Sequence, residues 1–361
     1  MEHGGFPGGR AEAVTATARP RRFWLIRALG VLAMLLACTP ASAQGSGSAT
    51  LDQVRQRGEL RCGLNPLAPG FGMPDSQGVM RGLDADHCRA IAAAIFGDAG
   101  KVRFVGTTTQ NRFTTLQSGE IDVLVRNTTW TLTREAALGL LFTGIHFYDG
   151  TGFLVKKSLN VKQAKELDGA TVCVTPGSST ELAVADFFRV HAIKWTPILI
   201  QDLTEIRAAF LAGRCDAYST DLSVLSTFRA SQGEKKDDFV LLPDVISKEP
   251  LGRVVRKGDD KWFDLIRWTM FALITAEELG VTQANVDSHA ASNNPDIRRL
   301  LGLEGDLGKA LGVDNAFAAH AIRAVGNYGE TWERNMAPLD VPRGINRLWT
   351  KGGLHYAPPM R

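Results

Sequence analysis

Beyond its first 43 residues, the chain lacks any second long apolar run. The most apolar segment there, residues 262–275, is interrupted by Asp264 and Arg267. A helix that crosses a bilayer needs about 20 predominantly apolar residues. This segment is therefore expected to form a buried amphipathic helix, and the chain after residue 43 is expected to be soluble.

The chain also lacks an excess of charge of one sign. Residues 1–43 contain five arginines and two glutamates, which account for the whole formal net charge of +3. The rest of the chain is balanced, with 36 basic and 36 acidic residues. Such a chain presents no basic surface to nucleic acid or anionic lipid, so neither is expected as a partner.

Cysteine is scarce. Four of the five cysteines follow residue 43, namely Cys62, Cys88, Cys173 and Cys215. No two of them lie within four residues of each other, which argues against a zinc site. An even number of cysteines in an exported chain favours disulfides, with three possible connectivities. Nearness in sequence favours the pairs Cys62–Cys88 and Cys173–Cys215, and the alternative is four buried thiols.

Motifs for catalysis are lacking as well. The sequence shows no nucleophile placed with a base, and no cluster of His, Asp and Glu residues at metal-ligand spacing. No catalytic residue, cofactor or metal ion is therefore expected, and the chain is not expected to be an enzyme.

The N-terminus contains the features of an export signal. Arginines in residues 19–27 precede the short apolar run of residues 28–37, and an Ala-Ser-Ala site ends at Ala43. This pattern predicts a cleaved signal peptide and a periplasmic product. The alternative is a lipoprotein site at Cys38, which would tether the product to a membrane.

From residue 51 onward, strand and helix patterns alternate, which is typical of an α/β fold with helices on both faces of a sheet. One helix, with Cys88, Ile91 and Ile95 on its apolar face, is expected to begin with Asp84 as its cap and to end at Gly97. The chain after residue 43 exceeds what one hydrophobic core usually serves, so two lobes are expected.

The chain is expected to pass between these lobes twice. Residues 150–156 would cross outward and residues 248–255 would return, which makes a hinge of two strands. The expected division is a signal peptide at 1–43, a linker at 44–50, lobe 1 at 51–149 and 248–303, lobe 2 at 150–247, and a helical C-terminal extension at 304–361.

A repeated unit supports two lobes of similar design. Residues 116–122 (LQSGEID) and 210–216 (FLAGRCD) both indicate a helix end, a glycine cap and an aspartate turn before a strand. Asp122 and Asp216 are interpreted as structural turn residues. Five positions after each aspartate lie Asn127 and Asp221, which places both just beyond the carboxyl end of a strand, where ligands bind in α/β sheets.

The side chains near these positions suit a zwitterion. Arg134 can hold an α-carboxylate, with hydroxyl or backbone donors from Thr129 and Ser179. Asp221, helped by Asn127, can accept from an α-ammonium group, although Asp221 alone could also be a helix cap. Ser178 and Ser179 lie where a helix is expected to begin, which favours anion binding, and Ser178 is also interpreted as the cap of that helix.

These motifs resemble the polar amino-acid-binding proteins of ABC importers, and in particular the general L-amino-acid-binding subfamily. The resemblance is carried by residues 127–134 (NTTWTLTR), 178–181 (SSTE), 215–221 (CDAYSTD), 247–252 (SKEPLG), 282–287 (TQANVD), 325–330 (VGNYGE), 333–335 (ERN) and 356–359 (YAPP). It implies a type II periplasmic-binding fold that closes on a free L-amino acid. It also implies a monomer that delivers its ligand to the membrane subunits of an ABC permease.

The resemblance implies the same roles for these residues, with Arg134, Thr129 and Ser179 on the α-carboxylate and Asp221 and Asn127 on the α-amino group. Residues 110–112 (QNR) further resemble acidic-amino-acid binders. We therefore hypothesise that Arg112, with Arg126, biases the site toward glutamate, aspartate and their amides. The alternatives are a periplasmic enzyme of the same fold, such as a dehydratase, and a ligand-sensing partner of a receptor.

Overall fold

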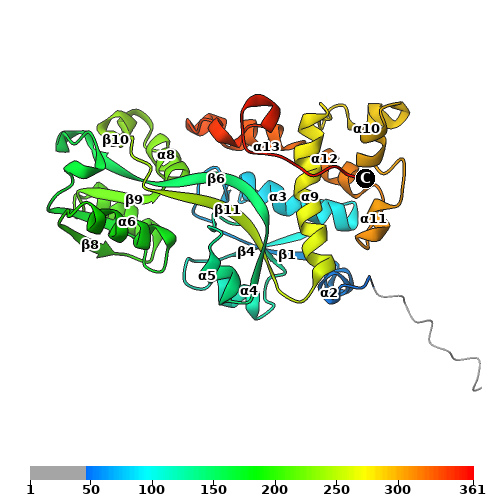
Figure 1. Cartoon of the computed structure of the whole chain (residues 1–361), viewed down its shortest axis with the longest axis horizontal. Helices are drawn as coiled ribbons and strands as arrows, with labels where there is room; N and C mark the ends of the chain where they lie inside the picture. Colours follow the sequence, from blue (N-terminus) through cyan, green and yellow to red (C-terminus); the bar gives the residue numbers. More distant parts are fainter. Residues whose placement is uncertain (1–45) are drawn as a thin grey trace, which may run out of the picture. The chain divides into compact units, whose positions relative to one another are not determined.

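The computed structural model describes residues 46–361. The expected signal peptide, the alternative lipid site at Cys38 and the first two residues of the expected linker lie outside the described residues. The described chain forms an α/β unit in which one mixed sheet runs through two lobes (Figure 1). Within residues 46–361, no helix combines the length and the apolar character that crossing a membrane requires.

The nine-stranded main sheet has a group of parallel strands at each end. At the lobe 1 end the order is β4 (Val102–Gly106), β1 (Leu60–Leu64) and β5 (Val123–Leu124). At the lobe 2 end the order is β9 (Ala217–Asp221), β7 (Ala170–Val174) and β8 (Trp195–Leu199). Between these groups lie β11 (Ser247–Arg256) and β6 (Leu140–Lys156), and β10 (Phe239–Leu241) pairs with the end of β6. A separate small sheet joins β2 (Met73–Pro74) and β3 (Met80–Arg81).

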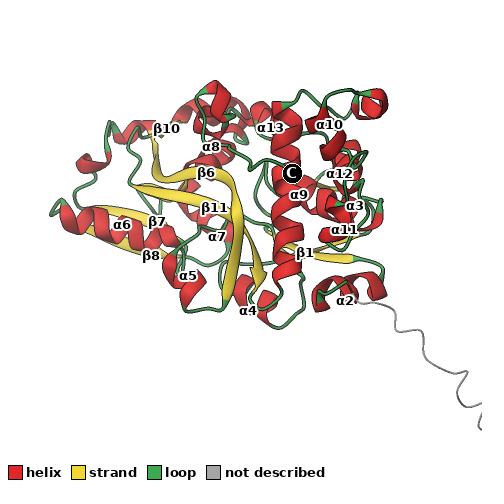
Figure 2. Ribbon diagram, turned by 45° about the vertical axis from the view of Figure 1, so that its right-hand side comes forward, coloured by secondary structure: helices red, strands yellow, loops and turns green. Residues whose placement is uncertain are grey.

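The strands β6 and β11 are the hinge. They pair antiparallel from Leu140 opposite Arg256 to Thr151 opposite Ser247, so both strands run from one lobe into the other (Figure 2). Two register shifts lie next to Gly252, where an added Cβ would come within 2.8 Å of the Phe142 side chain. Glycine is therefore needed at this bulge. The expected hinge of two crossing strands is confirmed.

Helices cover the sheet in both lobes. Those of lobe 1 are α2 (Ala49–Arg57), α3 (Leu83–Phe96), α4 (Arg112–Gln117), α5 (Leu132–Ala136), α9 (Asp260–Glu278) and α10 (Pro295–Leu300). Those of lobe 2 are α6 (Ser179–Val190), α7 (Leu203–Leu211) and α8 (Leu222–Ala230). The C-terminal segment adds α11 (Leu307–Ala310), α12 (Phe317–Val325) and α13 (Tyr328–Asn335). Short 3₁₀ helices lie at Lys157–Leu159, Ala164–Glu166, Gly233–Asp238, Val286–Ala291, Ala337–Leu339, Gly344–Asn346 and Trp349–Lys351.

The start of α2 differs from the expectation, whereas the expected helix at residues 262–275 is present. The side chain of Ser48 caps α2 by accepting from the Leu51 N–H, so residues 49 and 50 of the expected linker belong to this helix. The expected amphipathic segment at residues 262–275 lies within α9, where Trp262 and Leu273 are among its buried residues. This helix is confirmed.

In lobe 2, side chains alternate across the sheet. Phe153 and Val172 face one core together with Phe188 of α6. Their strand neighbours Leu154 and Cys173 belong to another core cluster, which includes residues of α7 and α8. The period of two along each strand therefore fills both faces of this part of the sheet.

The prediction that Asp84 caps α3 is wrong. Gly82 is the N-cap residue, and the chain enters the helix there with a φ of 126°. A Cβ at Gly82 would lie 2.1 Å from the Phe71 carbonyl oxygen, so no larger residue fits. Asp84 lies inside the buried helix and is 3.1 Å from Nε2 of His146 in β6. The predicted helix end at Gly97 is confirmed.

The repeated unit has the same structural role in each lobe. The Asp122 carboxylate accepts from the Arg61 N–H of β1 at 2.7 Å, and the Asp216 carboxylate accepts from the Thr171 N–H of β7 at 2.8 Å. Asp122 thus links the turn before β5 to the second residue of the parallel strand β1, and Asp216 links the turn before β9 to the second residue of the parallel strand β7. The interpretation of both as structural residues is confirmed.

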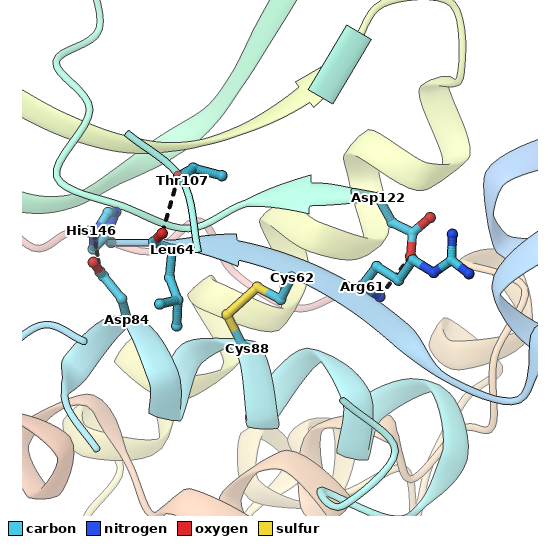
Figure 3. The surroundings of a disulfide bond; sticks show 8 residues. All are labelled: Arg61, Cys62, Leu64, Asp84, Cys88, Thr107, Asp122 and His146. Carbon is cyan, nitrogen blue, oxygen red and sulfur yellow. Dashed lines mark hydrogen bonds and ion pairs between the residues drawn. A yellow bond between two sulfur atoms is a disulfide. The ribbon is translucent and has the colours of Figure 1, made fainter. Parts of the chain in front are cut away.

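Both expected disulfides are present. Cys62 of β1 bonds to Cys88 of α3, with the Cα atoms 6.0 Å apart (Figure 3). Cys173 of β7 bonds to Cys215, which lies just before β9, with the Cα atoms 5.6 Å apart. Each disulfide therefore cross-links one lobe internally and leaves the hinge free to bend.

Candidate functional site

The loop after β5 carries the site residues of lobe 1. It is fixed to the hinge by a hydrogen bond of 2.8 Å from the Trp130 N–H to the Pro250 carbonyl, and by a bridge between Thr129 and Leu251. The side chain of Thr131 then caps α5, which contains Arg134. This places Asn127, Thr129 and Arg134 on one short stretch of backbone at the carboxyl end of the strand.

Two loops of lobe 2 face them. Ser178 caps α6 by accepting from the Glu181 N–H, as expected, and its own hydroxyl donates to the Thr175 carbonyl at 2.6 Å. Ser179 is the first residue of α6. Asp221 ends β9 and is the N-cap residue of α8, but its side chain makes no capping bond. The capping alternative for the Asp221 carboxylate is therefore wrong.

Asn127 and Asp221 meet across the two lobes, with Nδ2 of Asn127 donating to Oδ2 of Asp221 at 2.8 Å. Burial is the main reason why the pKa of Asp221 is raised to about 6, and the nearby charge of Glu249 adds to it. The bond from Asn127 and the charges of Arg112 and Arg126 act in the opposite direction. This carboxylate is therefore a buried acceptor that an ammonium group would stabilise in its ionised form.

Three buried arginines lie near this pair. Arg134 donates from Nη1 to the Thr129 carbonyl at 2.7 Å, while Arg112 and Arg126 are 4% and 2% exposed. Within the described chain, Nε of Arg112 and both Nε and Nη1 of Arg126 are buried without a hydrogen-bond partner. Burial lowers the pKa of Arg126 to about 10, which still leaves it charged at neutral pH. These groups suit an anionic ligand.

The aromatic residues of this region pack against the protein. Trp130 stacks on Phe142 with the ring centroids 5.6 Å apart, and its Nε1 donates to Glu135. Phe113 lies under two guanidinium groups, 4.7 Å from that of Arg112 and 5.5 Å from that of Arg134. Cation–π contact therefore orients both arginines.

The sequence did not indicate two carboxylates of the hinge. Glu249 accepts hydrogen bonds from the hydroxyls of Thr129 and Ser179, and Asp149, its partner across the strands, accepts from Ser223. Burial and the charge of Asp221 raise the pKa of Asp149 to about 8. The available signal was one acidic residue in each of the two strands that cross between the lobes.

Two further bonds close the cleft between the lobes. Nε2 of Gln110 donates to the Pro176 carbonyl and Nη1 of Arg207 donates to the Leu67 carbonyl, both at 2.9 Å. A cavity of about 740 Å³ remains between the lobes. Its lining includes Thr129, Arg134, Ser178, Ser179 and Glu249. Asn127, Asp221, Arg112 and Arg126 do not line it.

The described residues contain no group of three or more His, Cys, Asp or Glu side chains arranged to hold a metal ion. The buried polar groups between the lobes instead form two chemical sets, with guanidinium and hydroxyl groups as donors and the Asp221 carboxylate as an acceptor. Such a pair of sets can hold a small molecule that carries both charges.

Comparisons with known proteins agree with this arrangement. The general L-amino acid-binding periplasmic protein AapJ of Rhizobium johnstonii is 49% identical over 93% of this chain and 98% of AapJ. The glutamate/glutamine/aspartate/asparagine-binding protein BztA of Rhodobacter capsulatus is 52% identical over 88% of this chain and 95% of BztA. A solved periplasmic binding protein from Brucella ovis with glutathione bound superposes with a TM-score of 0.84 at 48% identity, and covers 86% of this chain and 99% of that one. Residues 60–284 match the family model, so the chain belongs to the bacterial extracellular solute-binding proteins, family 3.

Proposed function

We propose that this protein is the periplasmic substrate-binding component of an ABC importer, which binds free L-amino acids and delivers them to the membrane subunits of its permease. The observation that carries the proposal is that Asp221 of lobe 2 is buried against lobe 1, where Asn127 donates to it and the charges of Arg112 and Arg126 lie nearby. AapJ and BztA match nearly the whole chain, and their names support amino acids as the ligand class.

In this proposal the two ends of the zwitterion bind to different residues. Arg134 holds the α-carboxylate, with Thr129, Ser179 and the positive N-terminal end of α6 behind Ser178. Asp221 and Asn127 accept the α-ammonium group. A ligand bound in this way pairs its two charges with buried groups of both lobes at once. Binding and closure of the lobes are therefore coupled.

We further propose that the specificity is broad and favours glutamate, aspartate and their amides. Arg112 and Arg126 supply buried N–H groups that lack a partner among the described residues, and a side-chain carboxylate or amide oxygen would satisfy them. Arg112, Arg126 and Arg134 are buried near the carboxylates of Asp221 and Glu249. A ligand with one net negative charge would therefore neutralise the site.

The proposal also covers export, the oligomeric state and the absence of catalysis. Residues 1–43 act as a cleaved export signal, which agrees with the name of the relative AapJ as a periplasmic protein. The mature protein acts as a monomer, as one binding unit that docks on a permease. It carries its ligand without chemical conversion, in keeping with the description of its family as solute-binding proteins.

Calorimetric titration of the refolded, ligand-free mature chain with the twenty L-amino acids tests this function. We expect binding of several amino acids, and a loss of affinity of about 100-fold or more in Arg134→Ala and Asp221→Ala. Arg189→Ala is the matched control, because this arginine of α6 has a side chain that is 78% exposed. No binding across the panel, or equal affinities in all variants, would contradict the proposal.

A second ligand class is favoured by one specific observation. The related Brucella ovis protein was solved with glutathione bound. The γ-glutamyl part of glutathione carries a free α-ammonium and α-carboxylate group, which the same residues would hold. Glutathione therefore belongs in the titration panel, and its binding should be lost in the same two variants.

A further inference from the structure

Glu249 of β11 is surrounded by four hydroxyl groups. Oε1 accepts from Ser247 at 2.5 Å and from Thr151 at 3.0 Å. Oε2 accepts from Ser179 at 2.9 Å and from Thr129. The residue is 2% exposed, so these donors replace the water that an ionised carboxylate needs. The hydroxyls make a buried charge tolerable at the hinge.

The two oxygens of this carboxylate have different kinds of partners. Ser247 and Thr151, which bind Oε1, both belong to the hinge strands and face each other in the β6–β11 pairing. Thr129, which binds Oε2, comes from the loop of lobe 1, whereas Ser179 comes from α6 of lobe 2. The bonds to Oε1 are therefore independent of how far the lobes are apart. The Thr129 loop is itself fixed to β11, so Ser179 can join Thr129 at Oε2 only when the lobes are close.

The protons of the two interlobe hydroxyls are used in these bonds. Oγ1 of Thr129 and Oγ of Ser179 also lie 2.9 Å from each other. Each hydroxyl has one proton, so a hydroxyl that donates to Oε2 has none left for the α-carboxylate, which Thr129 and Ser179 would then hold through their backbone N–H groups. Glu249 thereby sets the orientation of two side chains that the proposed function places at the ligand.

Glu249 also acts on the neighbouring arginine. Burial lowers the pKa of Arg134, and the negative charge of Glu249 opposes this change. Glu249 thus acts on the guanidinium group proposed to hold the α-carboxylate and on the side chains of Thr129 and Ser179 beside it.

We propose that Glu249 is a positioning residue that latches the two lobes together around the ligand, through the convergence of Thr129 and Ser179 on Oε2. The inference rests on the proposed function for its ligand, but the latch itself joins the lobes directly. Opening removes the Ser179 donor of lobe 2 from a buried carboxylate, which favours the closed state and slows ligand release.

The test compares Glu249→Gln with the wild-type chain by stopped-flow measurement of glutamine release. The substitution keeps the shape and removes the charge, so we expect the dissociation rate to rise about tenfold, with little change in the association rate. Ser247→Ala is the control, because it removes a donor to Oε1 and leaves the interlobe bonds in place. Its dissociation rate should change by less than about twofold.

A double-mutant cycle separates the latch from a merely structural role. In a Ser179→Ala background, Glu249→Gln should have a much smaller effect on the dissociation rate, because the lobe 2 donor is already gone. An unchanged rate in Glu249→Gln, or an undiminished effect in the Ser179→Ala background, would overturn the latch. Thermal melting of each ligand-free variant shows whether it is folded.

The latch also has a readout that needs no ligand. Small-angle scattering of the ligand-free chain should give a larger radius of gyration for Glu249→Gln than for wild type and Ser247→Ala. If the wild type binds no amino acid, the proposed function fails and scattering alone decides the latch. Equal radii in that case would overturn the latch as well.

Discussion

At the scale of single residues, the proposed contact between Asp221 and the ligand's ammonium group would make binding sensitive to pH. Its pKa is raised to about 6, while that of Asp149 is raised to about 8, so Asp149 keeps its proton below neutral pH. An ammonium ligand needs the ionised form of Asp221. We therefore expect the affinity for glutamine, measured by calorimetry, to be constant near pH 7 and to fall about tenfold per pH unit below about pH 6.

The same shift has the opposite effect on the ligand-free protein. Because burial disfavours the ionised form, the contribution of Asp221 to stability is complete below about pH 4 and is lost as the pH rises through about 6. Asp221→Asn should weaken this trend in urea unfolding curves recorded between pH 4 and 7. Asp149, whose pKa is raised to about 8, contributes a trend of the same sign, so the double variant with Asp149→Asn should remove it. A trend that persists in the double variant would show that another group titrates there.

The sequence indicates some of these residues and not others, for physical reasons. Asn127 and Asp221 could be predicted because they follow a repeated helix–turn–strand unit at equal spacing, and the structure brings them within 2.8 Å. Glu249 and Asp149 could not, because their meeting depends on the register of β6 against β11 and on the bulge at Gly252. Nothing local in the sequence determines that register.

At the scale of elements, the aspartate turns hold the parallel strands in place. The Asp216 carboxylate accepts from both the N–H and the hydroxyl of Thr171, at 2.8 and 2.6 Å. We expect Asp216→Ala to lower the free energy of unfolding by about 1–3 kcal/mol, because the Thr171 donors lose their acceptor. Urea unfolding measures this change. Asp186→Ala, which breaks an exposed ion pair with Arg189, should cost less than about 1 kcal/mol.

Element boundaries show where local sequence reasoning works. The cap at Ser178 follows from local chemistry and is confirmed. The start of α3 does not follow from local chemistry. It depends on the close approach of Gly82 to the Phe71 carbonyl and on the contact of Asp84 with His146, which is distant in sequence. An aspartate near a helix start is more often a cap, but Asp84 is buried in the core, where it contacts His146.

At the scale of the whole described chain, the alternating pattern and the repeat were sufficient to predict two α/β lobes and a hinge of two strands. They were not sufficient to place the C-terminal segment. That segment packs into the core of lobe 1, where Phe317, Leu348 and Met360 share a cluster with Ile91 and Trp262. It also contacts the hinge, since the Asn346 side chain accepts from the Tyr148 N–H at 2.7 Å and donates to its carbonyl at 2.9 Å.

This packing makes the C-terminal segment part of the fold. The helix α3 is buried along almost its whole length, and α12, which is buried through residues such as Phe317 and Ile322, packs against it. A chain that ends at residue 303 would expose this apolar surface and lose the Asn346 bonds to the hinge. We expect it to melt without a cooperative transition and to be digested rapidly by protease, whereas Asn346→Ala in the full chain should lower stability by only about 1–3 kcal/mol. A truncated chain that melts cooperatively and binds glutamine would show that the lobe 1 core is complete without this segment.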